Sequence, residues 1–277
     1  MSQIESLSDD RDSVNTKQAR IDRWDPEDPS FWSTAGKSHA TRNLLISIPC
    51  LLCAFAIWIF WSIITVQMKN LGFPFSNAQL FTLSAIAGLA GATLRIPNAF
   101  MIGIAGGRII IAVSTILLII PALGVGIALQ HKTTPYEVFL LLAALSGIGG
   151  GNFSSSMSNI TMFFPKHSQG IALGLNAGLG NLGVSITQIL LPALMTFPLF
   201  GLLSGSGMPL TDVAGAKAGT LVWIQNAGMV WVPVLLVLGL VAWWGMDSLP
   251  AIKIGSPLLA LIKVTALGLV GFAGTVL

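Results

Sequence analysis

The sequence predicts an all-α membrane protein, and two observations lead to this prediction. The chain has 277 residues, of which 53% are hydrophobic and only 9% are charged. A soluble domain carries about a quarter charged residues, so this chain lacks the charge to cover a surface that faces water. Six apolar runs are also long enough to cross a lipid bilayer as helices, which takes about 20 residues each. These predicted spans are Leu44–Val66, Leu80–Met101, Ile109–Leu129, Val138–Phe163, Ile171–Met195 and Leu221–Met246.

The predicted spans divide the chain into three parts. Residues 1–43 form a polar tail with eight acids and six bases, and this tail lacks the apolar core of a signal peptide. We expect it to be cytosolic and disordered at first, with Trp24–Trp32 lying along the membrane surface. Residues 44–246 form the six-helix transmembrane domain, and residues 247–277 form a divergent tail.

The divergent tail contains one more apolar run, Leu258–Leu277. It has 20 residues and a single charge, Lys263, which near the cytosolic end can extend toward the interface. The run therefore predicts the start of a seventh span. Because no polar anchor follows it, we expect a truncated segment.

Lysines and arginines in the predicted loops indicate the orientation of the chain in the membrane. With the N-terminus in the cytosol, nine of them lie on the inner side and three on the outer side. This asymmetry favours a cytosolic N-terminus. The inner set is Arg11, Lys17, Arg20, Arg23, Lys37, Arg42, Arg108, Lys166 and Lys253, and the outer set is Lys69, Lys132 and Lys217.

Few residues in the spans are suited to catalysis or to metal binding. Cys50 and Cys53 form a C-x-x-C pattern, but no second cysteine pair and no nearby histidine accompanies it. We interpret both as small apolar residues of a helix. The three histidines lie in loops or in the tail. We therefore expect no metal, no cofactor, no nucleic-acid partner and no enzymatic activity.

Arg95 is the most informative residue, because it lies inside the second span. An ionisable residue there is costly and marks a functional site by default. The only acids between Leu44 and Met246 are Glu137 and Asp212, both in predicted outer loops. Arg95 either bonds backbone carbonyls or lies hydrated near the inner interface, or it faces a water-filled cavity and binds an anion. Its planar fork of N–H donors suits a planar oxyanion.

The fifth span is rich in glycine, which allows close helix packing in membranes. Its helix-packing signature is Gly174, Gly178, Gly180 and Gly183. On one helical face lie Asn181, Ser185 and Gln188, and Asn176 falls roughly opposite. Such side chains either bond neighbouring helices or supply neutral donors beside an anion. In the fourth span, Phe153 either packs between helices or forms a wall of the anion site.

Short segments of three spans carry a resemblance to a known family. They are Gly91–Pro97 in the second span, Gly151–Met157 in the fourth and Ala172–Gly183 in the fifth. These segments resemble the NarK-type nitrate/nitrite porters of the major facilitator superfamily. The N-terminal Trp24–Trp32 is similar to them as well, and the resemblance covers roughly residues 23–250.

The resemblance implies half of a major facilitator fold, built as two inverted three-helix repeats with a partial seventh apolar segment. It implies nitrate and nitrite as substrates, exchanged by alternating access across the bacterial inner membrane, as in an antiporter of nitrate assimilation. Arg95, Asn181, Phe153 and Asn176 correspond to substrate-binding positions, and a C-terminal six-helix half would be missing. The alternatives are a carrier for another small anion and a fragment without transport activity.

Overall fold

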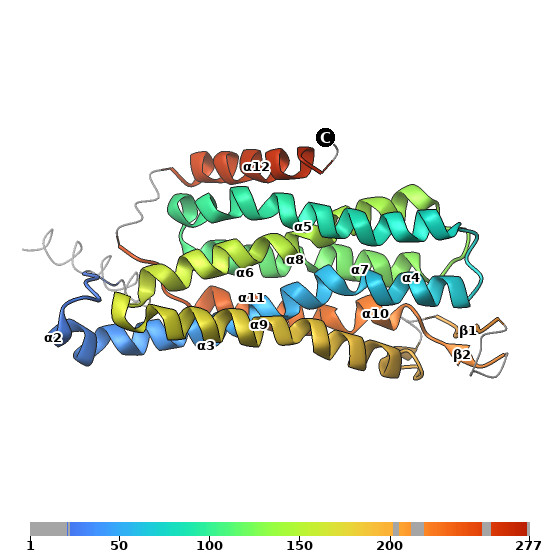
Figure 1. Cartoon of the computed structure of the whole chain (residues 1–277), viewed down its shortest axis with the longest axis horizontal. Coiled ribbons are helices and arrows are strands. Elements are labelled where there is room, and N and C mark those ends of the chain that lie inside the picture. Colours follow the sequence, from blue (N-terminus) through green and yellow to red (C-terminus); the bar gives the residue numbers. More distant parts are fainter. Residues whose placement is uncertain (1–20, 22, 202–204, 212–218, 251–255, 276–277) are drawn as a thin grey trace, which may run out of the picture.

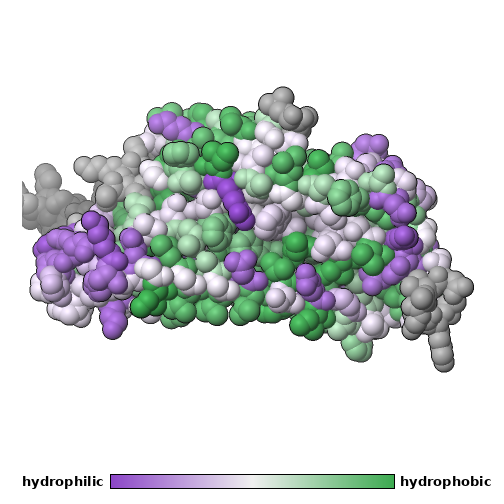
Figure 2. Space-filling view, in the orientation of Figure 1, coloured by the Kyte–Doolittle hydropathy of each residue, from purple (hydrophilic) through white to green (hydrophobic). Residues whose placement is uncertain are grey.

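The computed structural model describes residues 21, 23–201, 205–211, 219–250 and 256–275. Within them, six helical segments are long and apolar enough to cross a membrane, and they run side by side in one bundle (Figure 1). Hydrophilic side chains gather at both ends of the bundle, with mostly hydrophobic ones between (Figure 2). The predicted all-α membrane fold is therefore confirmed.

The bundle is built from long helices and a few short elements. Two of the spans change direction at a buried residue. Helix α3 passes into α4 at Phe60, and helix α6 passes into α7 at Leu118. The helices are α2 (Pro29–Phe31), α3 (Lys37–Ile59), α4 (Trp61–Asn70), α5 (Asn77–Ala105), α6 (Gly107–Leu117), α7 (Ile119–Ala128), α8 (Tyr136–Phe163), α9 (Lys166–Leu194), α10 (Asn226–Met229), α11 (Trp231–Gly245) and α12 (Pro257–Ala273), with the π-helix η1 (Trp32–Gly36) and the strands β1 (Met208–Pro209) and β2 (Leu221–Val222).

The first span begins well before the predicted Leu44, because Asp28 starts a helix there. The Asp28 carboxylate accepts hydrogen bonds from the backbone amides of Ser30 at 2.9 Å and Phe31 at 3.4 Å. Pro29 fills the first turn, where a missing amide proton costs nothing. The helical segment then continues without interruption from Pro29 to Asn70.

The described part of the N-terminal tail packs against the ends of α8 and α9. The Trp24 indole donates a hydrogen bond to the Met162 carbonyl at 3.1 Å, and its ring centroid lies 5.0 Å from that of Phe163. The Glu27 carboxylate accepts a bond from the Lys166 backbone amide at 2.9 Å, at the start of α9. The first part of the tail, where disorder is expected, falls on residues 1–20 and 22, which lie outside the described residues.

The sixth span begins later than predicted, at Asn226 rather than at Leu221. Leu221 and Val222 form strand β2, which pairs antiparallel with β1. The Asn226 side-chain amide then donates to the carbonyls of Leu194 at 2.9 Å and Phe197 at 2.7 Å, beyond the end of α9. Apolar residues such as Leu221 and Val222 suit a strand as well as a span, so hydropathy alone placed the start too early.

Helix pairing in the bundle follows a twofold pattern. Helix α5 packs along α8, and α3 packs along α9, while α6 and α7 pack on α11. The first three spans form one unit and the last three another. If the first span is exchanged with the fourth, the second with the fifth and the third with the sixth, the same set of contacts results. Two repeated three-helix units are what half of a major facilitator fold contains.

Helix α12, the apolar segment that follows the six spans, lies along α5 (Figure 1). A Cβ atom added to Gly271 of α12 would lie 2.7 Å from the Leu94 side chain and 2.9 Å from Pro97. The Thr93 and Thr275 hydroxyls are 3.1 Å apart. The helix thus packs closely on the segment of α5 that carries Arg95.

Candidate anion-binding site

Arg95 lies where α3, α5 and α8 approach most closely. A Cβ atom on Gly150 of α8 would lie 2.7 Å from the Gly91 Cα atom of α5. A Cβ atom on Gly91 would in turn overlap the Trp58 indole of α3. Glycine at both positions lets the helices meet this closely, and it places Arg95 beside residues of the two neighbouring helices.

The Arg95 guanidinium contacts two aromatic side chains. Its central carbon, Cζ, is 5.3 Å from the centroid of the Trp58 ring and 5.1 Å from that of Phe153. Its Nε donates a hydrogen bond to the Gly150 carbonyl at 3.3 Å. A cation within about 6 Å of an aromatic face is attracted by the ring quadrupole. Together these contacts fix the orientation of the half-buried side chain.

The charge of Arg95 has no carboxylate partner among the residues that the structure describes. Their ion pairs involve Arg23, His39 and Arg42, near the N-terminal end. Glu137 was expected in a loop but lies in the first turn of α8, about 20 Å along the helix from Gly150 at 1.5 Å per residue. Asp212 is outside the described residues. Of the five N–H donors of a guanidinium, one is bonded to the described chain.

Phe153 belongs to this aromatic cluster, but the sequence did not single out Trp58. Phe153 stacks on Phe55, with centroids 5.9 Å apart and planes inclined by 19°. The Trp58 indole donates to the Ala87 carbonyl at 2.8 Å, which holds its ring over α5. Tryptophans of membrane proteins are enriched at the interfaces. A tryptophan near the middle of the predicted first span was therefore the signal that could have identified it.

The two asparagines of α9 lie in different surroundings, and neither hydrogen-bonds to Arg95 within the described chain. Asn181 is exposed, and its amide donates to the Ala177 carbonyl of its own helix at 2.8 Å. Asn176 is fully buried, and its amide donates to the Ser156 hydroxyl of α8 at 2.8 Å. Asn176 therefore packs between helices, whereas Asn181 presents its side chain to open space.

The glycine signature of α9 is divided in the same way. A Cβ atom on Gly180 would lie 2.7 Å from the Leu51 side chain, and one on Gly183 would overlap the Leu52 carbonyl, so both glycines pack on α3. Around Gly174 and Gly178, nothing in the described structure lies within 4 Å of an added Cβ atom. The packing role expected of these two glycines is therefore not fulfilled within this bundle, because they lie on an open face of α9.

Comparison with known proteins finds relatives that are named nitrate/nitrite transporters. The chain is 45% identical over 243 residues to the nitrate/nitrite transporter NarU of Salmonella typhimurium, a match that covers 88% of this chain and 51% of the relative. The chain is a homologue of the NarK-type porters. It is also 45% identical over 236 residues to the probable nitrate/nitrite antiporter NarK2 of Thermus thermophilus. The NarK-type resemblance of the three segments is thereby confirmed.

The match to the NarK-type porters extends over most of this chain but not over most of the relatives. The chain spans about half the length of the relatives it matches, with 50% of NarU from Escherichia coli and 52% of the Thermus protein covered. No family model matches the chain. The relatives carry names of transporters rather than of enzymes.

Proposed function

We propose that this chain is the N-terminal half of a NarK-type carrier for nitrate and nitrite. The observation that carries the proposal is the Arg95 guanidinium, held against Trp58 and Phe153 without a carboxylate partner in the described structure. A half-buried cation within a membrane-spanning helix is costly unless an anion partners it. An anionic substrate supplies that charge, and the printed names of the relatives support nitrate and nitrite as the anions.

The shape of the cluster suits a small planar oxyanion. A guanidinium lies in the plane of nitrate and donates two parallel hydrogen bonds to its oxygens. The Trp58 and Phe153 rings hold the guanidinium and form apolar walls beside it, which reduces the water that competes for the anion. The single bond from Nε to Gly150 leaves the terminal nitrogens to bind the substrate.

The exposed face of α9 supports the presence of a second half in the working carrier. Gly174 and Gly178 have open space beside them, and Asn181 is exposed. We propose that a C-terminal six-helix half packs on this face and brings Asn181 to the anion. The carrier would then work by alternating access between its halves, and the relatives are about twice as long as this chain.

We further propose that the chain spans the bacterial inner membrane with its N-terminus in the cytosol, and that it exchanges anions without proton coupling. The excess of Lys and Arg in the loops of one side supports this orientation. Glu137, His39 and His167 lie near the ends of α8, α3 and α9, and the middle parts of the six spans hold no Asp, Glu or His, which supports exchange.

The test is transport by purified protein in lipid vesicles. The chain alone and the chain joined to the C-terminal half of NarU from E. coli are each reconstituted, and nitrate uptake against internal nitrite is measured. We expect uptake by the joined protein, which persists when a protonophore is added, and none by the chain alone. Absence of uptake by a correctly inserted joined protein, or uptake of a small carboxylate in preference to nitrate, would overturn the proposal.

A further inference from the structure

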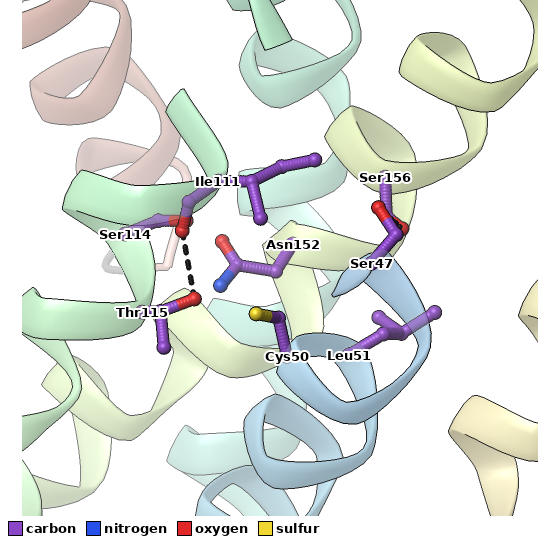
Figure 3. A pocket seen from close by; sticks show the side chains of 8 residues that line it. All are labelled: Ser47, Cys50, Leu51, Ile111, Ser114, Thr115, Asn152 and Ser156. Atoms are coloured by element: carbon purple, nitrogen blue, oxygen red, sulfur yellow. Dashed lines mark hydrogen bonds between the residues drawn. The ribbon is translucent and has the colours of Figure 1, made fainter. Parts of the chain in front are cut away.

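A small cavity lies between α3, α6 and α8 (Figure 3). Its volume is about 10 Å³, and all eight residues around it are neutral, five of them with a hydroxyl or amide side chain. Most of them are buried in the bundle. The lining residues are Ser47, Cys50, Leu51, Ile111, Ser114, Thr115, Asn152 and Ser156.

The side chain of Asn152 makes this cavity unusual. Asn152 is 6% exposed, and its amide lies among Cys50, Ile111 and Thr115 (Figure 3). Its Oδ1 atom has no hydrogen-bond partner in the described part of the chain. A buried amide oxygen in a membrane bundle is costly unless a donor group forms a hydrogen bond to it.

A chain of hydrogen bonds leads from α9 to the same cavity. The Asn176 amide donates to the Ser156 hydroxyl at 2.8 Å, and the Ser156 hydroxyl donates to that of Ser47 at 3.5 Å. On the opposite wall, Thr115 donates to the Ile111 carbonyl at 2.7 Å and keeps its oxygen lone pairs as acceptors.

We propose that this cavity binds one water molecule. The water donates hydrogen bonds to Asn152 Oδ1 and to Thr115 Oγ1, whose side chains lie on the same side of the cavity (Figure 3). Buried waters in proteins make two to four hydrogen bonds, and one of them needs a cavity of at least about 10–15 Å³. A metal cation does not fit, because the lining holds no charge to compensate it.

The water joins α8 to α6, because Asn152 belongs to the first helix and Thr115 to the second. At the other end of the cavity, hydrogen bonds between Asn176, Ser156 and Ser47 join α9, α8 and α3. Polar contacts around this cavity thus involve four of the six spans.

Radiolytic labelling tests the proposal, because hydroxyl radicals generated from a bound water oxidise the side chain beside it. Cys50 lines the cavity and is 2% exposed, while Cys53 is 3% exposed and does not line it. Cys53 is therefore a matched internal control. The protein is irradiated with X-rays in H₂¹⁸O, and oxidation of each cysteine is measured by mass spectrometry. We expect Cys50 to be oxidised severalfold faster than Cys53 and to carry the ¹⁸O label.

Equal oxidation rates of Cys50 and Cys53 in the unmodified protein would overturn the proposal, and this comparison does not depend on any variant folding. Two variants extend the test. Asn152→Leu fills the cavity with an apolar side chain and should bring Cys50 oxidation down to that of Cys53, and Thr115→Val, which keeps the shape of threonine, should lower it in part. Unchanged Cys50 labelling in a folded Asn152→Leu protein would also exclude the water.

Discussion

Replacing Arg95 by lysine keeps the positive charge but removes the planar donor that binds the anion in the proposed site. Lysine cannot form the bond from Nε to the Gly150 carbonyl, and its compact ammonium group donates from a single point. Loss of one charge-assisted hydrogen bond to nitrate costs about 1.5–3 kcal/mol. At 1.4 kcal/mol per decade, this corresponds to roughly a tenfold to hundredfold weaker affinity for nitrate.

The assay is nitrate uptake by the chain joined to a C-terminal half, with each variant at the same amount of protein in the vesicles. Arg42→Lys is the matched control, because the Arg42 side chain is 50% exposed and pairs with Asp247, far along the chain from the site. We expect normal uptake by this control and a strong loss with Arg95→Lys. If uptake by Arg95→Lys equals that of the unmodified protein, Arg95 has a structural role, since a hydrated arginine near the interface tolerates lysine.

Three further substitutions test contacts of the bundle. The new methyl group of Gly183→Ala would overlap a carbonyl of α3, so this change should lower the free energy of unfolding by about 1–3 kcal/mol in a detergent melt. Gly178→Ala should leave the free energy of unfolding unchanged. Equal effects of the two changes would contradict the description of α9 as having one packed and one open face. Trp58→Phe should keep an aromatic ring beside Arg95 but lose the bond to α5, which costs about 0.5–1.5 kcal/mol of stability; a melt at the unmodified temperature would show that this bond is unimportant. Glu27→Ala should speed hydrogen exchange at the first amides of α9 by up to about fivefold, and unchanged exchange would mean that the tail does not cap this helix.

The sequence was sufficient to predict the spans and the unusual position of Arg95. A run of about 20 apolar residues has few alternatives to a spanning helix, and an arginine within such a run stands out by its cost. The start of the sixth span was missed because Leu221 and Val222 are equally apolar in a strand. The early start of the first span follows from the Asp28 cap, a local signal that a hydropathy criterion does not include.

The surroundings of the candidate site were harder to predict, since they depend on which helices meet. Helical periodicity placed Asn176 and Asn181 on different faces of the fifth span, but it did not indicate which face packs against the bundle. The contact of Gly180 with α3 decides this, because it turns Asn176 inward and leaves Asn181 exposed. In the same way, Trp58 reaches Arg95 only because Gly91 of another helix lies opposite it.

The glycine contact between α5 and α8 has a mechanical consequence. Where Gly150 meets Gly91, backbone lies against backbone, with no layer of flexible side chains between the two helices. Sliding of packed helices is absorbed by small adjustments of side chains, and this contact has none to adjust. If the proposed carrier works by rocking of its halves, we expect α5 and α8 to move as one rigid unit. The Arg95 guanidinium and the Phe153 ring belong to that unit, so the proposed site would offer these contacts to an anion from either side of the membrane.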